Sequence, residues 1–133
     1  MEFMGFAEMN GVEFPEMRAA VIDAVKALAD EEYQRRVWVH KVYPKEGYYD
    51  DFSMNVNLLF DDTLVLDGPD RHLGTILATQ AEVEAMESLG SSLLELLDAQ
   101  GRDKSDLEYI EAPEWNSVVV AARRAYERLV RSD

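Results

Sequence analysis

Two runs of β-branched and aromatic residues constrain the fold of this chain most strongly. They are RVWVHKVY, from Arg36 to Tyr43, and FSMNVNLLF, from Phe52 to Phe60. Apolar and polar residues alternate in both runs, which is the pattern of a half-buried β-strand. The segment between them, 44–51, begins with proline and is otherwise mostly polar and aromatic. The sequence therefore predicts an antiparallel hairpin with a long loop.

The expected hairpin has one apolar face and one polar face. If Tyr43 pairs with Phe52, the apolar face pairs Val39 with Val56, because side chains two residues apart share a face. The opposite face carries Trp38, His40, Asn55 and Asn57. Such a sheet is covered by helices on one side and is open to water or to a partner on the other.

Three longer segments have the three- and four-residue apolar spacing of amphipathic helices. The first opens at Phe14-Pro15, because proline suits a first helical turn. The second is expected over 80–99, with Thr79 as its N-cap, Glu82 at the capping-box position and Gly101 ending it. One face of this helix is expected to carry Val83, Met86, Leu93, Leu94 and Leu97. The third begins near Pro113.

Shorter elements complete the predicted fold. LGTILA, 73–78, is expected to be a third strand and DLEYI, 106–110, a fourth, while Asp30 caps a short turn over 31–35. We expect a single α+β domain over residues 1–133, in which three main helices pack on one face of a mostly antiparallel sheet of about four strands. An irregular N-terminal segment over 1–13 is left open.

Composition narrows the class of protein and its compartment. The chain has 133 residues and no cysteine, which excludes disulfides and cysteine-ligated metals within it. No stretch approaches the roughly 18 apolar residues of a membrane helix. The N-terminus has no basic segment of the kind found in secretory signals. We expect a soluble cytoplasmic protein.

The charge is strongly acidic, with 27 acidic and 13 basic residues and a formal net charge of -14. Such a charge repels nucleic acid and anionic membranes and attracts a basic partner. We therefore expect neither nucleic-acid nor membrane binding, and a basic protein surface is the expected partner. Solubility alone is the alternative explanation of the acidity.

The acidic residues are concentrated between Glu46 and Asp70, where no lysine or arginine occurs. In the predicted hairpin Asp51 and Asp61 lie at opposite ends of one strand, about 33 Å apart. They could not share a metal ion or a substrate atom in that arrangement. The spacing of the acids after Asp61 also lacks the alternating ligands of a calcium hand, so neither a metal nor another cofactor is expected.

Aspartates next to tyrosines have the chemistry of a contact surface, where rings supply area and carboxylates meet arginine or lysine. We expect such a surface at the two ends of the second run. The candidate partner-binding residues are Tyr48, Tyr49, Asp50, Asp51, Asp61 and Asp62. Solvated loops are the alternative.

The polar face of the hairpin is a second candidate site. Its residues, Trp38, His40, Asn55 and Asn57, would suit a small-molecule ligand. His40 could act as a general base, but the local sequence places no carboxylate beside it and completes no triad with nearby Ser53. No catalytic residue is assigned, and enzymatic activity is left uncertain, with a non-enzymatic role favoured.

Six stretches carry a resemblance to a known family: FPEMR (14–18), YQRRVW (33–38), YYDDF (48–52), LLFDDT (58–63), LGTIL (73–77) and PEWNSVVVAAR (113–123). Together they resemble a family of small acidic uncharacterised proteins found mainly in actinobacteria. The resemblance implies a bacterial cytosolic protein, and it implies no catalytic or binding residues.

The leading hypothesis is a non-enzymatic acidic binding or regulatory module that recognises a basic protein surface, of which an immunity-like role is one form. The alternative is a small-molecule binder or enzyme that uses the open sheet face around Trp38 and His40. Self-association through an exposed strand edge would make a homo-oligomer, and this is left open as well.

Overall fold

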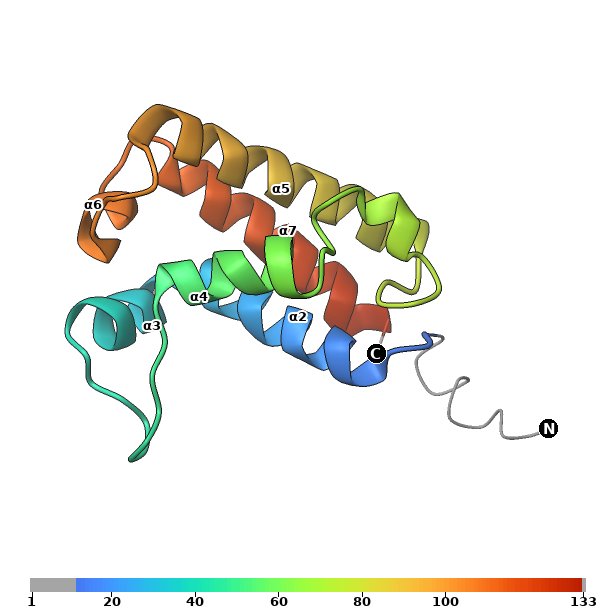
Figure 1. Cartoon of the computed structure of the whole chain (residues 1–133), viewed down its shortest axis with the longest axis horizontal. Helices are drawn as coiled ribbons and strands as arrows, with labels where there is room; N and C mark the ends of the chain where they lie inside the picture. The colour runs from blue at the N-terminus through green and yellow to red at the C-terminus, as the bar shows by residue number, and fades with distance from the viewer. Residues whose placement is uncertain (1–11, 133) are drawn as a thin grey trace.

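The computed structural model describes residues 12–132. Within this range the chain is helical, and its only β-type pairing is an isolated bridge between Leu73 and Leu77 (Figure 1). The predicted α+β fold with an antiparallel sheet is therefore wrong. Of the N-terminal segment expected to be irregular, residues 1–11 lie outside the described range.

Three long helices form the body of the molecule. They are α2 (Pro15–Ala29), α5 (Gln80–Gln100) and α7 (Trp115–Ser132). Helix α7 packs along both α2 and α5, so it is the central one of the three (Figure 1). No described helix is both long enough and apolar enough to cross a membrane.

Shorter helices cover one side and one end of this body. Two of them continue without a break from α-helix into π-helix, in which each N–H donates to the carbonyl five residues earlier. The short elements are α3 (Glu31–Tyr33) with η1 (Gln34–Val39), α4 (Phe52–Asn57) with η2 (Leu58–Asp62), the 3₁₀-helix η3 (Pro69–His72), and α6 (Asp106–Ile110).

The ends of the long helices agree with the sequence signals. Helix α2 begins at Pro15 as expected, and the hydroxyl of Thr79 accepts a hydrogen bond from the backbone N–H of Glu82 at 3.1 Å. Gly101 ends α5 with a φ of +84°, a conformation that glycine adopts without strain. The capping-box role predicted for Glu82 is wrong, because its carboxylate accepts from the N–H of Ala78 and binds Arg18 instead.

The first predicted strand is a helix. Asp30 accepts a hydrogen bond from the N–H of Tyr33 and starts α3 as expected, but the helix does not end at residue 35. It continues through η1, whose last turn is closed by a bond from the N–H of His40 to the carbonyl of Arg35 at 2.9 Å. Burial of Val37 and Trp38 in the core outweighs the strand preference of the β-branched residues.

The second predicted strand is also a helix. Its buried residues are Phe52, Asn55, Val56 and Leu59, a helical spacing of three, four and seven, whereas Met54 is 48% exposed. Strand alternation would have buried Met54 and exposed Asn55. The helical spacing of buried residues could not be recognised from apolar residues alone, because Asn55 is polar. Asn55 is buried through its hydrogen bonds to Asp50 and to the carbonyl of Asp51.

The predictions of a third and a fourth strand are also wrong. Residues 106–110 form α6, which starts with a capping box between Ser105 and Glu108. Residues 73–78 make a turn that buries Ile76 and Leu77 beneath the long helices. Since the described residues contain no sheet, the open sheet face and the strand edge expected from the sequence do not exist in this part of the chain.

An aromatic cluster joins the short helices to α7. The rings of Trp38, Phe52 and Trp115 lie 5.6 to 6.2 Å apart in edge-on contacts, and Tyr109 lies 4.5 Å from Phe52. The buried Gln34 accepts a hydrogen bond from the indole of Trp115 at 3.1 Å, and its amide donates to two carbonyls near the end of α2. Both the oxygen and the nitrogen of the buried Gln34 side chain therefore have hydrogen-bond partners.

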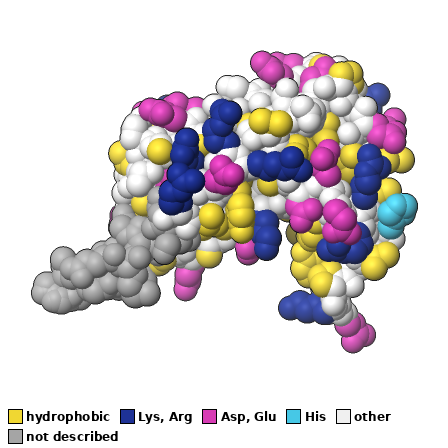
Figure 2. Space-filling model, turned by 180° about the vertical axis from the view of Figure 1, so that it is seen from behind, with side chains coloured by type: hydrophobic (Ala, Val, Ile, Leu, Met, Phe, Trp, Pro, Cys, Tyr) yellow, Lys and Arg dark blue, Asp and Glu magenta, His cyan; other side chains and the backbone are white. Residues whose placement is uncertain are grey.

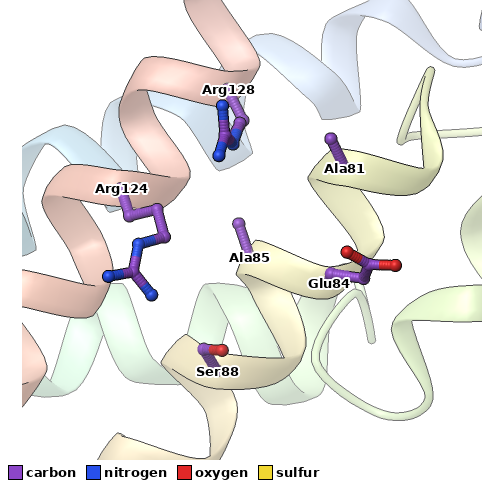
Figure 3. A pocket seen from close by; sticks show the side chains of 6 residues that line it. All are labelled: Ala81, Glu84, Ala85, Ser88, Arg124 and Arg128. Atoms are coloured by element: carbon purple, nitrogen blue, oxygen red, sulfur yellow. The ribbon is translucent and has the colours of Figure 1, made fainter.

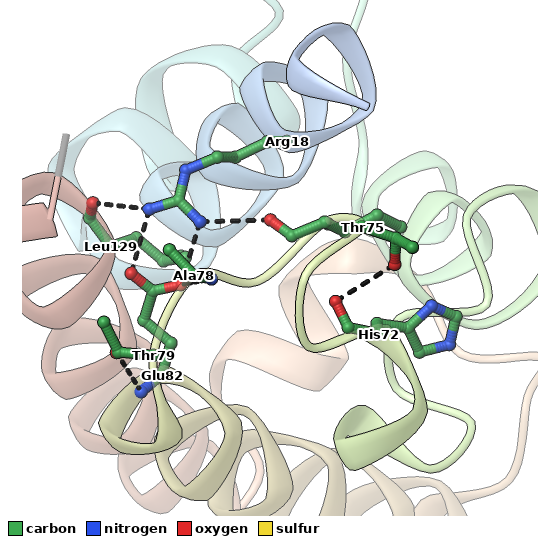
Figure 4. Close-up of polar contacts among 8 residues, drawn as sticks. Arg18, His72, Thr75, Ala78, Thr79, Glu82 and Leu129 are labelled. Atoms are coloured by element: carbon green, nitrogen blue, oxygen red, sulfur yellow. Dashed lines mark hydrogen bonds and ion pairs between the residues drawn. The ribbon is translucent and has the colours of Figure 1, made fainter. Parts of the chain in front are cut away.

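The opposite end of the three-helix body is held by Arg18. Its guanidinium binds both carboxylate oxygens of Glu82 and donates to the carbonyls of Ile76 and Leu129 at 3.0 and 3.1 Å (Figure 4). One side chain on α2 therefore contacts α5, α7 and the turn before α5. This network fixes the relative positions of the three long helices.

Candidate functional site

Asp50, a candidate partner-binding residue, lies at the centre of a hydrogen-bond network. Its carboxylate accepts from the hydroxyl of Tyr33 at 2.8 Å, from the indole of Trp38 at 2.8 Å, and from the amide of Asn55 at 3.0 and 3.1 Å. The structure thus brings together residues from both candidate sites. Asp50 ties the segment before α4 to the core, and its carboxylate is occupied by contacts within the chain.

Its neighbours Tyr49 and Asp51 are also bonded to each other. The hydroxyl of Tyr49 donates to Asp51 at 2.7 Å, and this bond, together with the charge of Asp51, raises the pKa of Tyr49 to about 12. The other oxygen of Asp51 caps α4 by accepting from the N–H of Met54 at 2.8 Å. Tyr49 is 51% exposed, whereas Asp51 is partly buried, so Tyr49 is the outward member of this pair.

A polar pocket of about 370 Å³ lies beside Asp50. Burial of the Tyr33 hydroxyl, and its hydrogen bonds to Tyr48 and Asp50, raise the pKa of Tyr33 well above its ordinary value. Tyr33 therefore stays protonated and acts as a donor at neutral pH. The pocket carries both acidic and basic side chains, so its charge favours neither anionic nor cationic ligands. Its lining residues are Asp23, Lys26, Ala27, Asp30, Tyr33, Arg36, Tyr48 and Asp50.

The second pair of aspartates lies at the other end of the same helix. Asp61 and Asp62 are exposed in η2, and ten helical residues place Asp61 about 15 Å from Asp51 rather than the 33 Å expected of a strand. Among the residues that the structure describes, no three His, Asp or Glu side chains are arranged to hold a metal ion.

Asp61 lines a groove between η2 and α5 that we call the acidic groove. It has a volume of about 440 Å³, and Leu64 and Leu94 in its wall are 48% and 45% exposed. Leu94 was expected on the core face of its helix, and that prediction is wrong. The groove is lined by Val56, Asn57, Phe60, Asp61, Leu64, Leu66, Asp67, Leu94 and Arg102.

The backbone holds Leu64 in a strained conformation. Its φ is +59°, in the left-handed region that costs a residue with a Cβ roughly 1–2 kcal/mol. The turn that imposes this φ ends η2 with bonds from the N–H and the hydroxyl of Thr63 to the carbonyl of Leu58. It then buries Val65 and Leu66, so that Leu64 is left at the wall of the groove.

The residues of the second candidate site do not form a common surface. Trp38 and Asn55 are buried, at 1% and 7% exposure, and both bind Asp50. His40 is exposed just after η1, whereas Asn57 lines the acidic groove. The polar face predicted for the hairpin is therefore divided between the interior and two separate parts of the surface.

Sequence reasoning missed the apolar part of the acidic groove. Leu64 lies two residues after Asp62, and leucine carries no signal for a left-handed conformation. Leu94 adjoins the buried Leu93 and was assigned to the core with it. The acids of the groove, by contrast, were visible as a stretch without lysine or arginine.

Comparison with known proteins gives one match. The model of a family described as "Domain of unknown function (DUF7945)" matches residues 12–133. Neither the curated proteins nor the solved structures contain a match to this chain.

Proposed function

We propose that this chain, which belongs to the DUF7945 family of domains of unknown function, is a non-enzymatic binding or regulatory module that recognises a basic segment of another protein. The acidic groove between η2 and α5 is the proposed contact site. The proposal rests on one observation: Leu64 and Leu94 are about half exposed in a groove that also carries Asp61 and Asp67.

The groove offers a partner both apolar area and negative charge. Full burial of a leucine side chain contributes roughly 1.5–3 kcal/mol, and here two leucines are already close to half buried before any partner binds. Carboxylates around such a patch steer a basic partner and fix its orientation. Arg102 also lines the groove and can bind a carboxylate or a carbonyl of the partner.

The charge of the surrounding helices favours the same kind of partner. Residues 46–70, which include α4 and η2, contain no lysine or arginine, and neither does α5. The occupant we propose is therefore a segment with one or two aliphatic residues flanked by lysine or arginine. We also propose that the protein is cytoplasmic and that its family is acidic and bacterial. An immunity-like role is one form of the proposed binding function.

The surface proposed here differs from the one expected from the sequence alone. Asp50 and Asp51 make hydrogen bonds that hold the Tyr33–Trp38 region and start α4, so neutralising them would disturb the fold as well as any contact. Asp61 and Asp62 are exposed, and Asp61 lines the groove. Asp61, together with Asp67 in the same groove, therefore gives the cleaner test.

The test uses synthetic peptides and the full chain. A fluorescent peptide of alternating lysine and leucine is compared with a lysine–serine peptide and a glutamate–leucine peptide, and binding is followed by anisotropy at low and high salt. The lysine–leucine peptide should bind most tightly. The Leu94→Gln variant should weaken its binding at all salt concentrations, and Asp61→Asn with Asp67→Asn should reduce association mainly at low salt.

A matched control removes the same charge elsewhere. Glu16 and Glu127 are exposed on α2 and α7, outside the groove, and their conversion to Gln together removes two negative charges, as the double aspartate variant does. Equal loss of binding in this control and in the groove variants would show that only the overall charge matters. That outcome, or no preference for the lysine–leucine peptide, would exclude the proposed site.

A further inference from the structure

The polar pocket beside Asp50 has hydrogen-bonding groups that the proposed peptide contact does not use. We call it the Tyr33 pocket. Its lining comes from α2, from α3 with η1, and from the segment before α4, which Figure 1 shows extending away from the helices. Its volume of about 370 Å³ is at the small end of the range for ligand sites, so it suits a single small molecule.

The order of protons around Tyr33 makes Tyr48 a hydrogen-bond acceptor. Tyr33 has one hydroxyl proton, which it donates to Asp50 at 2.8 Å. The bond of 2.5 Å between the hydroxyls of Tyr33 and Tyr48 must therefore use the proton of Tyr48. The oxygen of Tyr48 keeps lone pairs but has no proton left to donate. It therefore favours a ligand group that donates, such as an ammonium group.

Asp30 is a second acceptor in the lining of the pocket. One oxygen of its carboxylate accepts from the backbone N–H of Tyr33 at 3.1 Å, so the side chain is held in place as the cap of α3. Among the described residues nothing forms a hydrogen bond with its other oxygen. Asp30 and Tyr48 together can accept two of the three N–H groups of an ammonium ion.

Two cations, Lys26 and Arg36, complete the polar lining. Lys26 lies on the same face of α2 as Asp30, yet no ion pair or side-chain hydrogen bond joins it to a described residue. Arg36 is held with its guanidinium carbon 5.9 Å from the centre of the Tyr33 ring, and one of its nitrogens binds Glu32. The remaining N–H groups of Arg36 and the ammonium of Lys26 can bind a carboxylate.

Side chains of both charges do not by themselves mark a binding site. Figure 2 shows acidic and basic side chains intermixed over one face of the molecule. A hollow of about 330 Å³ between α5 and α7 also has both, but in Figure 3 the carboxylate of Glu84 points away from Arg124 and Arg128. The Tyr33 pocket differs because contacts within the chain hold both of its acceptors and one of its cations in place.

We propose that the Tyr33 pocket binds a free α-amino acid in its zwitterionic form. Tyr48 and Asp30 would accept from the ammonium group of the amino acid, and Lys26 and Arg36 would donate to its carboxylate. A simple cation or a simple anion would use only one of these two sets of groups. The site goes beyond the proposed peptide contact and is independent of it, because the pocket and the acidic groove share no lining residue.

The test is a titration of the full isotope-labelled chain, followed by amide chemical shifts. The probes are serine, glutamine and phenylalanine, each compared with its decarboxylated form and its N-acetylated form. At least one of the amino acids should give saturable shifts at Ala27, Tyr33 and Tyr48, and none at Ser88 in the hollow of Figure 3. Its two modified forms should bind about ten-fold more weakly, since each lacks one of the two charged groups.

Two variants assign the two ends of the ligand. Lys26→Gln should weaken binding of the amino acid about ten-fold and leave binding of the decarboxylated form unchanged. Tyr48→Phe should weaken binding of the amino acid and leave binding of the N-acetylated form unchanged, because the bond from Tyr33 to Asp50 is kept. The matched control is Arg124→Gln, which removes one positive charge from the hollow between α5 and α7 and should change the affinity by less than about two-fold.

Three outcomes would overturn the proposal. The first is the absence of saturable shifts with all three amino acids. The second is equal binding of an amino acid and either of its modified forms, because one charged group would then be sufficient. The third is an equal loss of affinity in Lys26→Gln and Arg124→Gln, which would make the effect one of overall charge.

Discussion

Arg18 on α2 and Glu82 on α5 form a two-pronged ion pair, with nitrogen–oxygen distances of 2.8 and 2.9 Å, although neither side chain is more than 1% exposed. The pair also forms hydrogen bonds with the carbonyls of Ile76 and Leu129 and with the N–H of Ala78. A buried pair of this kind gives limited net stability, but it makes the loss of either partner costly. The contact therefore specifies how the long helices meet.

Removing the cation alone should destabilise the protein strongly. Arg18→Met removes the guanidinium that pairs with the buried carboxylate of Glu82, and we expect the free energy of unfolding to fall by about 3–5 kcal/mol. Adding Glu82→Gln should restore part of this loss, because the neutral amide can still accept from Ala78. Urea denaturation of the single and double variants measures both effects. A double variant less stable than Arg18→Met would contradict the explanation.

Asp50 should matter for folding and Asp61 should not. In Asp50→Asn the new NH₂ group faces the donors of Trp38 and Asn55, so we expect a loss of about 1–3 kcal/mol. Asp61→Asn, at an exposed position, should change stability by less than about 0.5 kcal/mol. Urea unfolding followed by tryptophan fluorescence distinguishes them, and equal stability of the two variants would argue against the network.

The Leu64→Gly variant should weaken peptide binding without lowering the stability of the protein. Glycine relieves the strain of a φ of +59° but gives the unfolded chain more freedom, so stability should be unchanged or should rise by up to about 1 kcal/mol. Binding of the lysine–leucine peptide should weaken, since an exposed leucine is lost from the acidic groove. Thermal unfolding and peptide anisotropy report the two effects.

Lys41→Gly is the matched control for the strain. Lys41 follows η1 as Leu64 follows η2, and it has nearly the same φ, +58°, but it lies outside the acidic groove. Its substitution should affect stability in the same direction as Leu64→Gly and leave peptide binding unchanged. If Lys41→Gly weakens binding equally, Leu64 acts through the backbone and not through its side chain.

Asp106 should make stability depend on pH. Burial of its carboxyl group, followed by the nearby charge of Asp51, raises the pKa of Asp106 above its ordinary value of 3.8, and hydrogen bonding from the backbone N–H of Phe52 offsets this only in part. Between the ordinary and the raised pKa the native state binds more protons than the unfolded state. Stability is therefore lost as the pH rises through this window.

The Asp106→Asn variant removes this ionisation. Relative to the unchanged chain, it should gain stability as the pH rises through the raised pKa, and this pH-dependent gain should vanish below pH 3.8, where the carboxyl is protonated in both states. Loss of the favourable charge at the start of α6 adds an opposite contribution, so the slope with pH decides. Urea unfolding across the acid range gives the slope. A difference that does not vary with pH would contradict the raised pKa.

Local chemistry made part of the fold predictable. Pro15, Thr79 and Gly101 act through their own backbone or through groups a few residues away, and the starts of α2 and α5 and the end of α5 follow the sequence signals. Asp30 as a helix cap was predictable for the same reason. The exposed acids of the site were also visible, because a stretch without lysine or arginine is a property of the sequence itself.

The nature of the two alternating runs depended on contacts between distant residues. In the second run an apolar residue at every other position fits a strand, while the residues that are in fact buried fit a helix. Asn55 decides between them, because Asp50 and the carbonyl of Asp51 satisfy its amide in the interior and Met54 is left in solvent. In the first run Trp38 is buried through its contacts with Asp50, Phe52 and Trp115.

The sequence by itself therefore determined the charge of this protein, the absence of cysteine chemistry and the helix ends that short-range hydrogen bonds set. The tertiary structure alone decided which polar side chains are buried, that Asp50 faces inward while Asp61 lines a groove, and where Leu64 and Arg124 are exposed. The physical reason is that a buried polar group is stable only when a partner satisfies it. For Asn55 and Arg18 those partners are supplied by other elements of the fold, and no local pattern reveals them.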